Sequence, residues 1–301
     1  MKQILILGGS GFVGRHVCAK LAQLQWRITV PTRRRGNAWA VQALPGLDVI
    51  EADVHDEVAL GRLLAGQDAV LNLVAILHGT ERAFEQVHVE LPRKLARACT
   101  AAGVKRVLHI SALGAGLQAP SMYQRSKARG EEALRAAALD LTVLRPSVMF
   151  GPEDKFLNLF ARLQRLFPLI PLAGSGTRFQ PVWVEDVAQA LVNCLQDERT
   201  IGQTYEICGP EILTLKQLVE LAGCTSGVRH GLGRPVIPLP MVLGRLQARL
   251  MELAPGQPLM SRDNLDSMKV DNVASGTLPG LQALGITPAT LGAVAPSYLR
   301  A

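Results

Sequence analysis

The sequence has few aromatic and few charged residues for its length. Aromatic side chains make up 4% of the 301 residues and charged side chains 19%, whereas hydrophobic residues make up 48%. Disordered chains show the opposite balance, so we expect a folded protein with a sizeable core. The net charge of +7 suits acidic ligands such as a phosphorylated cofactor, or an anionic membrane. With so few aromatics and no nucleic-acid motif, we expect no nucleic-acid partner.

Cysteine is scarce, and long apolar runs are missing. The five cysteines form no C-x-x-C pair and the six histidines show no metal-ligand spacing, so neither a metal site nor a disulfide framework is expected. We expect buried free thiols in a reducing compartment. The sequence contains no stretch of eighteen apolar residues, so we expect no membrane-spanning helix. The N-terminus already resembles a strand, so we expect no signal peptide. These absences predict a cytoplasmic protein.

Glycines cluster directly after the first apolar run, Ile4–Leu7. Gly9, Gly11 and Gly14 satisfy G-x-G-x-x-G, and Gly8 extends the pattern to G-x-x-G-x-x-G. Between a strand and a helix, such glycines allow a tight turn and close approach of a diphosphate to the helix N-terminus. The alternative is a plain strand-to-helix turn. The residues expected to bind the cofactor here are Gly8, Ser10, Gly11, Phe12, Val13 and Gly14.

The second strand is predicted over Trp26–Pro31, and it is followed by Thr32 and three arginines rather than by an acid. In dinucleotide folds, an acid at this position binds the ribose 2′-hydroxyl, whereas arginine accommodates a 2′-phosphate. Arg33 and Arg34 therefore favour NADP(H) over NAD(H). The alternative is a solvated basic loop.

Two further strands are predicted to contribute cofactor contacts. The run Leu47–Ala52 is followed by Asp53 and Val54, which we expect beside the adenine; a helix cap before Glu57–Leu64 is a compatible role for Asp53. The apolar run Ala69–Leu77 is the fourth strand. Its cofactor-binding candidates are Leu73, Val74 and Ala75, the last being small enough for close passage.

A fifth strand, Val104–Ser111, is followed by the pattern Y-Q-R-S-K, with Tyr123 and Lys127 one helical turn apart. On a helix over Tyr123–Ala138 both side chains can meet one ligand. A lysine cation is expected to lower the pKa of the phenol and make it a general acid or base. Ser111 can hold the substrate oxygen, and Lys127 the nicotinamide ribose. The alternative is a surface tyrosine and lysine.

Alternating strands and helices continue through a sixth strand, Leu141–Leu144, after which Pro146 and Val148 are expected near the nicotinamide. This alternation predicts an α/β fold, a doubly wound parallel sheet with helices on both faces.

The chain resembles the short-chain dehydrogenase/reductase superfamily, of the extended or atypical kind. The resemblance is carried by GGSGFVG, by Ser111 with Tyr123 and Lys127, and by the later stretches QPVWVEDVAQAL and YEICG. Through PLPMVLGRLQARLMELAPGQPLMSRDNLDSMKVDNV, it is similar to the atypical group that contains the dehydrogenase-like accessory subunit of mitochondrial complex I. The resemblance implies a Rossmann fold, a nicotinamide dinucleotide, and a link to the respiratory chain or ubiquinone metabolism.

The organisation expected is a Rossmann domain over residues 1–150 plus about 178–210, and a smaller substrate or partner lobe over about 151–177 plus 211–301. Glu153–Phe167 is predicted to be a helix and Pro168–Gly176 a loop. Leu239–Leu253 is predicted to be an amphipathic helix whose leucines pack onto the lobe. The alternative is a basic helix at a membrane, peripheral to its inner face.

Three functions agree with these residues. The first is an NADP(H)-dependent oxidoreductase that acts on a carbonyl or alcohol of an unknown small molecule. The second is a non-catalytic scaffold that binds NADPH. The third is an epimerase or dehydratase of the sugar-nucleotide type, because the same serine, tyrosine and lysine serve that chemistry.

Overall fold

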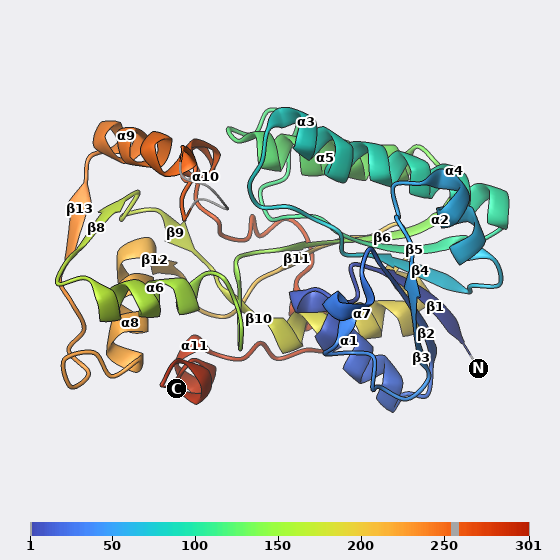
Figure 1. Ribbon diagram of the computed structural model, residues 1–301, viewed down its shortest axis with the longest axis horizontal. Coiled ribbons are helices and arrows are strands. Elements are labelled where there is room, and N and C mark those ends of the chain that lie inside the picture. The colour runs from blue at the N-terminus through green and yellow to red at the C-terminus, as the bar shows by residue number, and fades with distance from the viewer. Residues whose placement is uncertain (1, 254–258, 301) are drawn as a thin grey trace.

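The computed structural model describes residues 2–253 and 259–300, and its centre is a seven-stranded, entirely parallel sheet (Figure 1). The strand order is β11-β6-β5-β4-β1-β2-β3, so the chain runs outward from β1 in one direction and then in the other. This is the doubly wound Rossmann topology, and the predicted fold class is confirmed. The strands are β1 (Gln3–Leu7), β2 (Arg27–Thr32), β3 (Leu47–Glu51), β4 (Ala69–Asn72), β5 (Arg106–Ile110), β6 (Asp140–Pro146) and β11 (Thr204–Ile207).

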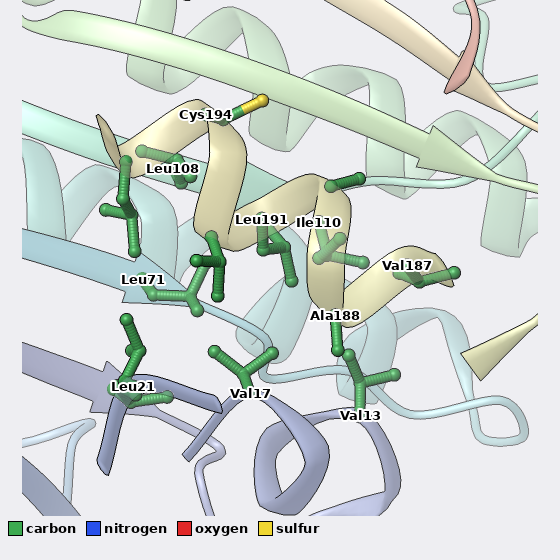
Figure 2. Packing of buried hydrophobic residues seen from close by; sticks show 14 of the residues in the cluster. Val13, Val17, Leu21, Leu71, Leu108, Ile110, Val187, Ala188, Leu191 and Cys194 are labelled. Atoms are coloured by element: carbon green, nitrogen blue, oxygen red, sulfur yellow. The ribbon is translucent and has the colours of Figure 1, made fainter. Parts of the chain in front are cut away.

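Helices cover both faces of the sheet. Helices α1 (Phe12–Gln23) and α7 (Val184–Gln196) pack on one face, where Val17 and Leu21 meet Leu191 over strand residues such as Leu108 (Figure 2). The other face is covered by α2 (Glu57–Leu64), α4 (Leu91–Ala102) and α5 (Met122–Arg135). Because both faces are covered, the central strands β1 and β4 are nearly continuous apolar runs, whereas the edge strand β3 is more exposed and contains two acids.

Local sequence signals explain where these helices begin and end. The Asp56 side chain accepts hydrogen bonds from the amides of Val58 and Ala59, so Asp56 caps α2 rather than the expected Asp53. Gly103 ends α4 at φ +72°, a conformation that favours glycine. The helical segment before Gly103 is divided into α3 (Glu81–Glu85), the π-helix η2 (Gln86–Glu90) and α4.

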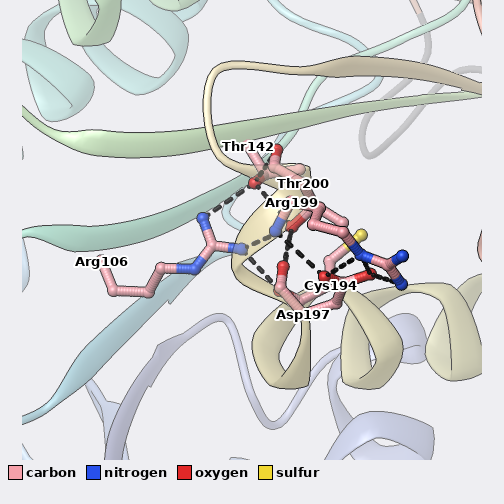
Figure 3. A network of polar contacts seen from close by, with 6 residues as sticks. All are labelled: Arg106, Thr142, Cys194, Asp197, Arg199 and Thr200. Atoms are coloured by element: carbon pink, nitrogen blue, oxygen red, sulfur yellow. Dashed lines mark hydrogen bonds and ion pairs between the residues drawn. The ribbon is translucent and has the colours of Figure 1, made fainter.

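A polar cluster that no sequence motif indicated holds the amino end of the sheet together (Figure 3). The Arg106 guanidinium at the start of β5 donates to Thr142 Oγ1 (2.8 Å), Thr200 Oγ1 (2.9 Å) and the Cys194 carbonyl (2.5 Å). These bonds join β5, β6 and the end of α7. The cluster lies at the end of the strands opposite to the predicted site, so we assign it a structural role.

The remaining elements pack around a separate core and are called here the C-terminal lobe. Its helices are α6 (Leu157–Leu166), α8 (Leu215–Thr225), α9 (Met241–Glu252), α10 (Arg262–Ser267), α11 (Leu291–Val294) and α12 (Pro296–Leu299). Its short strands are β8 (Ile170–Ala173), β9 (Arg178–Phe179), β12 (Leu213–Thr214) and β13 (Val236–Leu239); β7 (Met149–Phe150) and β10 (Val182–Trp183) lie where the chain enters and leaves it. The predicted domain boundaries stay a prediction.

Four expectations for this part of the chain were wrong. The loop predicted over Pro168–Gly176 contains β8, which pairs with β13, and the helix predicted from Glu153 begins at Leu157. The leucines of α9 do not pack onto the lobe but are exposed. Cys224 is exposed, although the other four cysteines are buried free thiols as predicted. No helix in the described ranges is long and apolar enough to span a bilayer.

Candidate functional site

The predicted cofactor and catalytic residues all follow the carboxyl ends of parallel strands, which meet at one edge of the sheet. The glycine turn follows β1, Arg33 follows β2 and Asp53 follows β3. On the other side of the switch between β1 and β4, Leu73–Ala75 follow β4, Ser111 follows β5 and Pro146 ends β6. Ligands of doubly wound folds bind outside this edge, at the point where the strand order reverses.

The glycines of the first turn are required by close packing. Gly8 has φ +82°, and a Cβ there would approach the Leu73 carbonyl carbon to 3.1 Å. A Cβ on Gly14 would lie 2.4 Å from the Gly8 carbonyl oxygen, so α1 can sit against the turn only with glycine at this position. Gly11 precedes α1 without a side-chain cap, and the first turn has no acid. The helix N-terminus is therefore suited to an anionic group.

Basic groups gather at the β2–β3 end of this edge. Arg33 and Arg34 are exposed, and Lys94 donates to the His55 carbonyl oxygen at 2.6 Å. Burial lowers the pKa of His55; Asp53 opposes the effect, while Lys94 and Arg33 add to it. Since these side chains share one electrostatic neighbourhood, the region presents mainly positive charge beside the Asp53–Val54 turn.

Ser111 and the Lys127 amine both lie at the end of β5. Lys127 is 1% exposed, and its Nζ donates to the Ile110 carbonyl oxygen at 2.7 Å, directly before Ser111. Burial lowers the pKa of Lys127 to about 8, with Glu131 acting in the opposite direction. Ser111 is 2% exposed, and its hydroxyl has no hydrogen-bond partner among the described residues. A buried unpaired hydroxyl is costly, so it is a candidate for contact with a ligand.

Tyr123 lies in the first turn of α5, with its ring packed edge-on against two others. Ring centroids lie 5.5 Å from His88 and 6.1 Å from Phe84. The side chain keeps partial exposure, yet desolvation raises its pKa to about 12. The expectation that Lys127 lowers this pKa is wrong for the chain by itself: burial dominates, and the phenol is protonated at neutral pH.

His88 is a residue that the sequence did not reveal, and it fixes the surroundings of Tyr123. Its Nδ1 pairs with Ser126 Oγ at 2.9 Å, while Nε2 accepts the Ile76 amide at 3.1 Å. Burial lowers the His88 pKa to about 2, so the ring is neutral. His88 belongs to the π-helix η2, and such π-turns are frequent at functional sites. Gly130 allows the approach, because a Cβ there would lie 2.0 Å from the His88 carbonyl oxygen.

A second buried polar pair lies one strand away. Asn72 on β4 and His109 on β5 are directly opposite in the sheet, and Asn72 Nδ2 lies 3.2 Å from His109 Nδ1. Asn72 Oδ1 also accepts the Val74 amide at 3.2 Å, which shapes the chain where Leu73–Ala75 leave the strand. Burial, with the Lys127 charge adding to it, holds the His109 pKa well below its usual value. The single polar residue in the apolar run was the only sequence signal for this pair.

The C-terminal lobe supplies Asp263, which the sequence also did not reveal. Its carboxylate accepts the backbone amides of Met122 at 2.6 Å and Tyr123 at 3.1 Å, and the residue is 7% exposed. A carboxylate at a helix N-terminus accepts hydrogen bonds from the free amides, and its negative charge interacts favourably with the positive end of the helix dipole. The helix that carries Tyr123 is thus held from both parts of the molecule. No cluster of metal-ligating side chains occurs in residues 2–253 and 259–300.

Comparison with known proteins agrees with this geometry. The model of the NAD dependent epimerase/dehydratase family matches residues 4–208. The mouse protein "NADH dehydrogenase [ubiquinone] 1 alpha subcomplex subunit 9, mitochondrial" is 33% identical over 293 residues, covering 95% of this chain and 76% of that protein. The ceramide reductase of Caulobacter vibrioides is 34% identical over 191 residues, covering 63% and 59%. The structure of Escherichia coli NADPH-dependent quinone oxidoreductase QOR2 with NADPH superposes with a TM-score of 0.78 at 23% identity, covering 98% and 99%, and so shares the fold.

Proposed function

The chain belongs to the NAD dependent epimerase/dehydratase family of extended short-chain dehydrogenases/reductases, and we propose that it is an NADP(H)-dependent oxidoreductase that acts on a carbonyl or alcohol carbon. The family resemblance expected from the sequence is thereby confirmed. The cofactor would supply or accept the hydride. We propose that the cofactor is bound by the glycine turn, by Arg33 and Arg34, by the segments after β3, β4 and β6, and by the residues at the end of β5.

The unpartnered hydroxyl of Ser111 is the observation that supports this proposal most. The residue follows Ile110, whose carbonyl oxygen accepts a hydrogen bond from the Lys127 ammonium, and it lies at the end of β5, where water is largely excluded. A substrate oxygen could accept its hydrogen bond and remove the cost of the unpaired group. The residue is thus suited to hold a carbonyl oxygen, and less suited to a purely structural role.

Tyr123 is proposed as the proton donor, and its protonation state favours one direction of reaction. With a pKa of about 12, the phenol carries its proton at neutral pH and can give it to an oxygen on which negative charge develops. Alcohol oxidation would require the phenolate instead, which burial disfavours. We therefore propose that Tyr123 acts as the proton donor in carbonyl reduction at neutral pH, with the net direction set by the ratio of NADPH to NADP⁺.

Lys127 is proposed to hold a ribose hydroxyl and to supply positive charge near Tyr123. One of its three N–H groups is used by the Ile110 carbonyl, which fixes the amine at the end of β5 and leaves donors for a ligand. At neutral pH a lysine with a pKa of about 8 is mainly the cation. With the cofactor bound, this cation is proposed to offset part of the cost that burial imposes on the Tyr123 phenolate.

NADP(H) is proposed over NAD(H) because arginines, and no acid, follow β2. Both Arg33 and Arg34 are exposed, so a 2′-phosphate could reach them without displacing a partner. The family description refers to NAD, and the similar quinone oxidoreductase structure contains NADPH. The preference of this chain consequently depends on its own arginines.

The relatives suggest lipophilic substrates and a respiratory connection. One relative is a mitochondrial NADH dehydrogenase subunit, a second is a ceramide reductase, and a protein with the same fold is a quinone oxidoreductase. We propose a substrate of lipid or quinone character, and an association with the respiratory chain at the inner face of the membrane. The relationship to a respiratory subunit over 95% of the chain also favours a second function, that of an NADPH-binding scaffold without turnover.

Hydride transfer distinguishes the enzyme from the scaffold. The purified chain would be incubated with NADPH carrying deuterium at both C4 positions and a panel of long-chain ketones and long-chain aldehydes, and products analysed by mass spectrometry. Short-chain ubiquinone analogues would be followed instead by the anaerobic oxidation of NADPH, because deuterium on a quinol oxygen exchanges with water. The enzyme predicts deuterium in at least one product, or quinone-dependent oxidation of NADPH, and the loss of this activity in Tyr123→Phe. Binding of NADPH with no transfer to any member would contradict the enzyme and favour the scaffold. Inversion of configuration at one carbon of an added sugar nucleotide, with no net oxidation of NADPH, would favour an epimerase.

A further inference from the structure

Helix α9 is packed through its smallest residues. Gly244 and Ala248 are buried, and α9 lies against β8 and α10. A Cβ on Gly244 would lie 2.4 Å from the Cβ of Ala173 on β8. This face has no room for leucine, so the helix cannot rotate to bury its large side chains. The packing therefore fixes which side of α9 points outward.

The outward side of α9 is aliphatic and cationic. Apolar residues on this side, together with Leu253 directly after the helix, are between 50% and 79% exposed: Val242, Leu243, Leu246, Leu250 and Leu253. Arg245 and Arg249 are exposed with them, and Arg245 pairs with Asp266 of α10. Glu252, the only acid of the helix, is half-buried and accepts hydrogen bonds from Arg262. The exposed side of α9 thus carries two arginines, one of them paired with Asp266, and no acid of its own.

Other exposed apolar residues lie at the same end of the molecule. The run from Leu166 to Leu169 leads from α6 into β8, and it exposes Leu166, Phe167 and Leu169. Ile237 is exposed on β13, opposite Pro171 of β8. Figure 1 shows β8, β13 and α9 together at the end of the C-terminal lobe farthest from the β1–β3 side of the sheet. Residues 226–253 contain four arginines and one glutamate, so this end is basic as well as apolar.

We propose that this end of the C-terminal lobe docks on an anionic phospholipid surface, with the outward side of α9 lying in the plane of the lipid headgroups. An interfacial helix combines exposed leucines with flanking cations, and each arginine gains from anionic lipid. Leucine is under-represented among the residues that contribute most to binding between proteins, whereas exposed leucines beside arginines are typical of an interfacial helix. Lipid therefore fits better than a protein partner. The inference rests on the membrane-peripheral part of the proposed function, not on the cofactor.

Vesicle flotation tests the proposal with the full chain. Vesicles of phosphatidylcholine alone and with 30% phosphatidylglycerol would be compared at about 50 and 500 mM salt. We expect the wild type to float only with the anionic vesicles, and less at high salt. The double variant Leu246→Glu with Leu250→Glu should bind at least about tenfold more weakly, and Arg249→Glu about five- to tenfold more weakly. Val58→Glu, at a position 64% exposed on α2, is the matched control and should bind like the wild type.

Two further measurements make each outcome decisive. The thermal shift with NADPH should be the same in every variant, which shows that folding and the cofactor site are intact; its absence in the wild type would instead refute the proposed function alone. Sedimentation velocity detects a second copy as the occupant. Failure of the wild type to bind anionic vesicles, equal binding by the double variant, or an α9-dependent dimer that does not float would each overturn lipid docking.

Discussion

Asp263 of α10 holds the first turn of the helix that carries Tyr123, although 140 residues separate the two in the chain. Its two carboxylate oxygens accept the amides of Met122 and Tyr123, so the C-terminal lobe contributes directly to the position of the proposed proton donor. Helix α10 is in turn joined to α9 by the Arg245–Asp266 ion pair and by Arg262 with Glu252. The two parts of the molecule therefore meet at the start of α5.

Replacing Asp263 with alanine should lower the free energy of unfolding by about 1–2 kcal/mol, because two buried amides lose their acceptors. Urea denaturation measures this change. Asp266→Ala on the same helix removes only partly exposed ion pairs, and should cost less than about 1 kcal/mol. Equal costs for the two variants would show that the Asp263 cap is unimportant.

Acid should destabilise the protein through His88. Its folded pKa is about 2 against a usual value of 6.5, so between these values the unfolded chain binds a proton that the folded chain does not. The free energy of unfolding therefore rises with pH across this window, and the stability that the neutral ring contributes is lost progressively as the pH falls below 6.5. His109 adds to the effect in the same direction. Denaturation between pH 4.5 and 6 should give a slope smaller by about 1 kcal/mol per pH unit in His88→Gln; an unchanged slope would contradict a neutral buried ring.

Lys127 should affect stability at alkaline pH with a defined sign. Burial lowers its pKa from 10.5 to about 8, so above pH 8 the unfolded chain retains a proton that the folded chain releases. The free energy of unfolding of the wild type, relative to that of Lys127→Met, should therefore rise between pH 8 and 9. The buried cysteines, whose pKa values are raised, lower the free energy of unfolding of both proteins over the same interval, so the difference between the two proteins isolates the lysine. Urea denaturation measures this difference, and a difference that stays constant or falls would argue against a buried amine.

Tyr123→Phe should retain NADPH binding and lose turnover by about 10²- to 10⁴-fold, because only the phenolic proton is removed. Deuterium transfer from NADPH to the best carbonyl of the panel measures the loss. Tyr205→Phe, a buried tyrosine of β11 outside the site, serves as the control and should keep its activity. Full activity in Tyr123→Phe would assign the proton to another group.

The sequence was most informative where local chemistry determines structure. The apolar run Ile4–Leu7 and the glycines after it predict the strand and the turn that the structure contains. The proposed site residues follow strand ends, and a parallel sheet brings those ends together. The doubly wound parallel sheet was therefore accessible from pattern alone, and the grouping of these residues at one edge follows from it.

Contacts between distant residues were not accessible in this way. Asp263 and His88 act through neighbours that only the folded chain brings near, and the desolvation that raises the Tyr123 pKa depends on that packing. The leucines of α9 have the spacing of a buried face, but the close contact at Gly244 places the opposite side of the helix against the lobe. Periodicity shows that a helix has two faces, and the size of the residues at the contact decides which one is buried.

Calorimetric titration of the full chain with NADPH and with NADH tests the central claim most directly. We predict that NADPH binds at least about tenfold more tightly, and that the double variant Arg33→Ala with Arg34→Ala loses this preference while NADH binding stays unchanged. Arg27→Ala, at the other end of β2, should behave like the wild type. Equal or tighter binding of NADH by the wild type, or a preference that survives the double variant, would contradict the account.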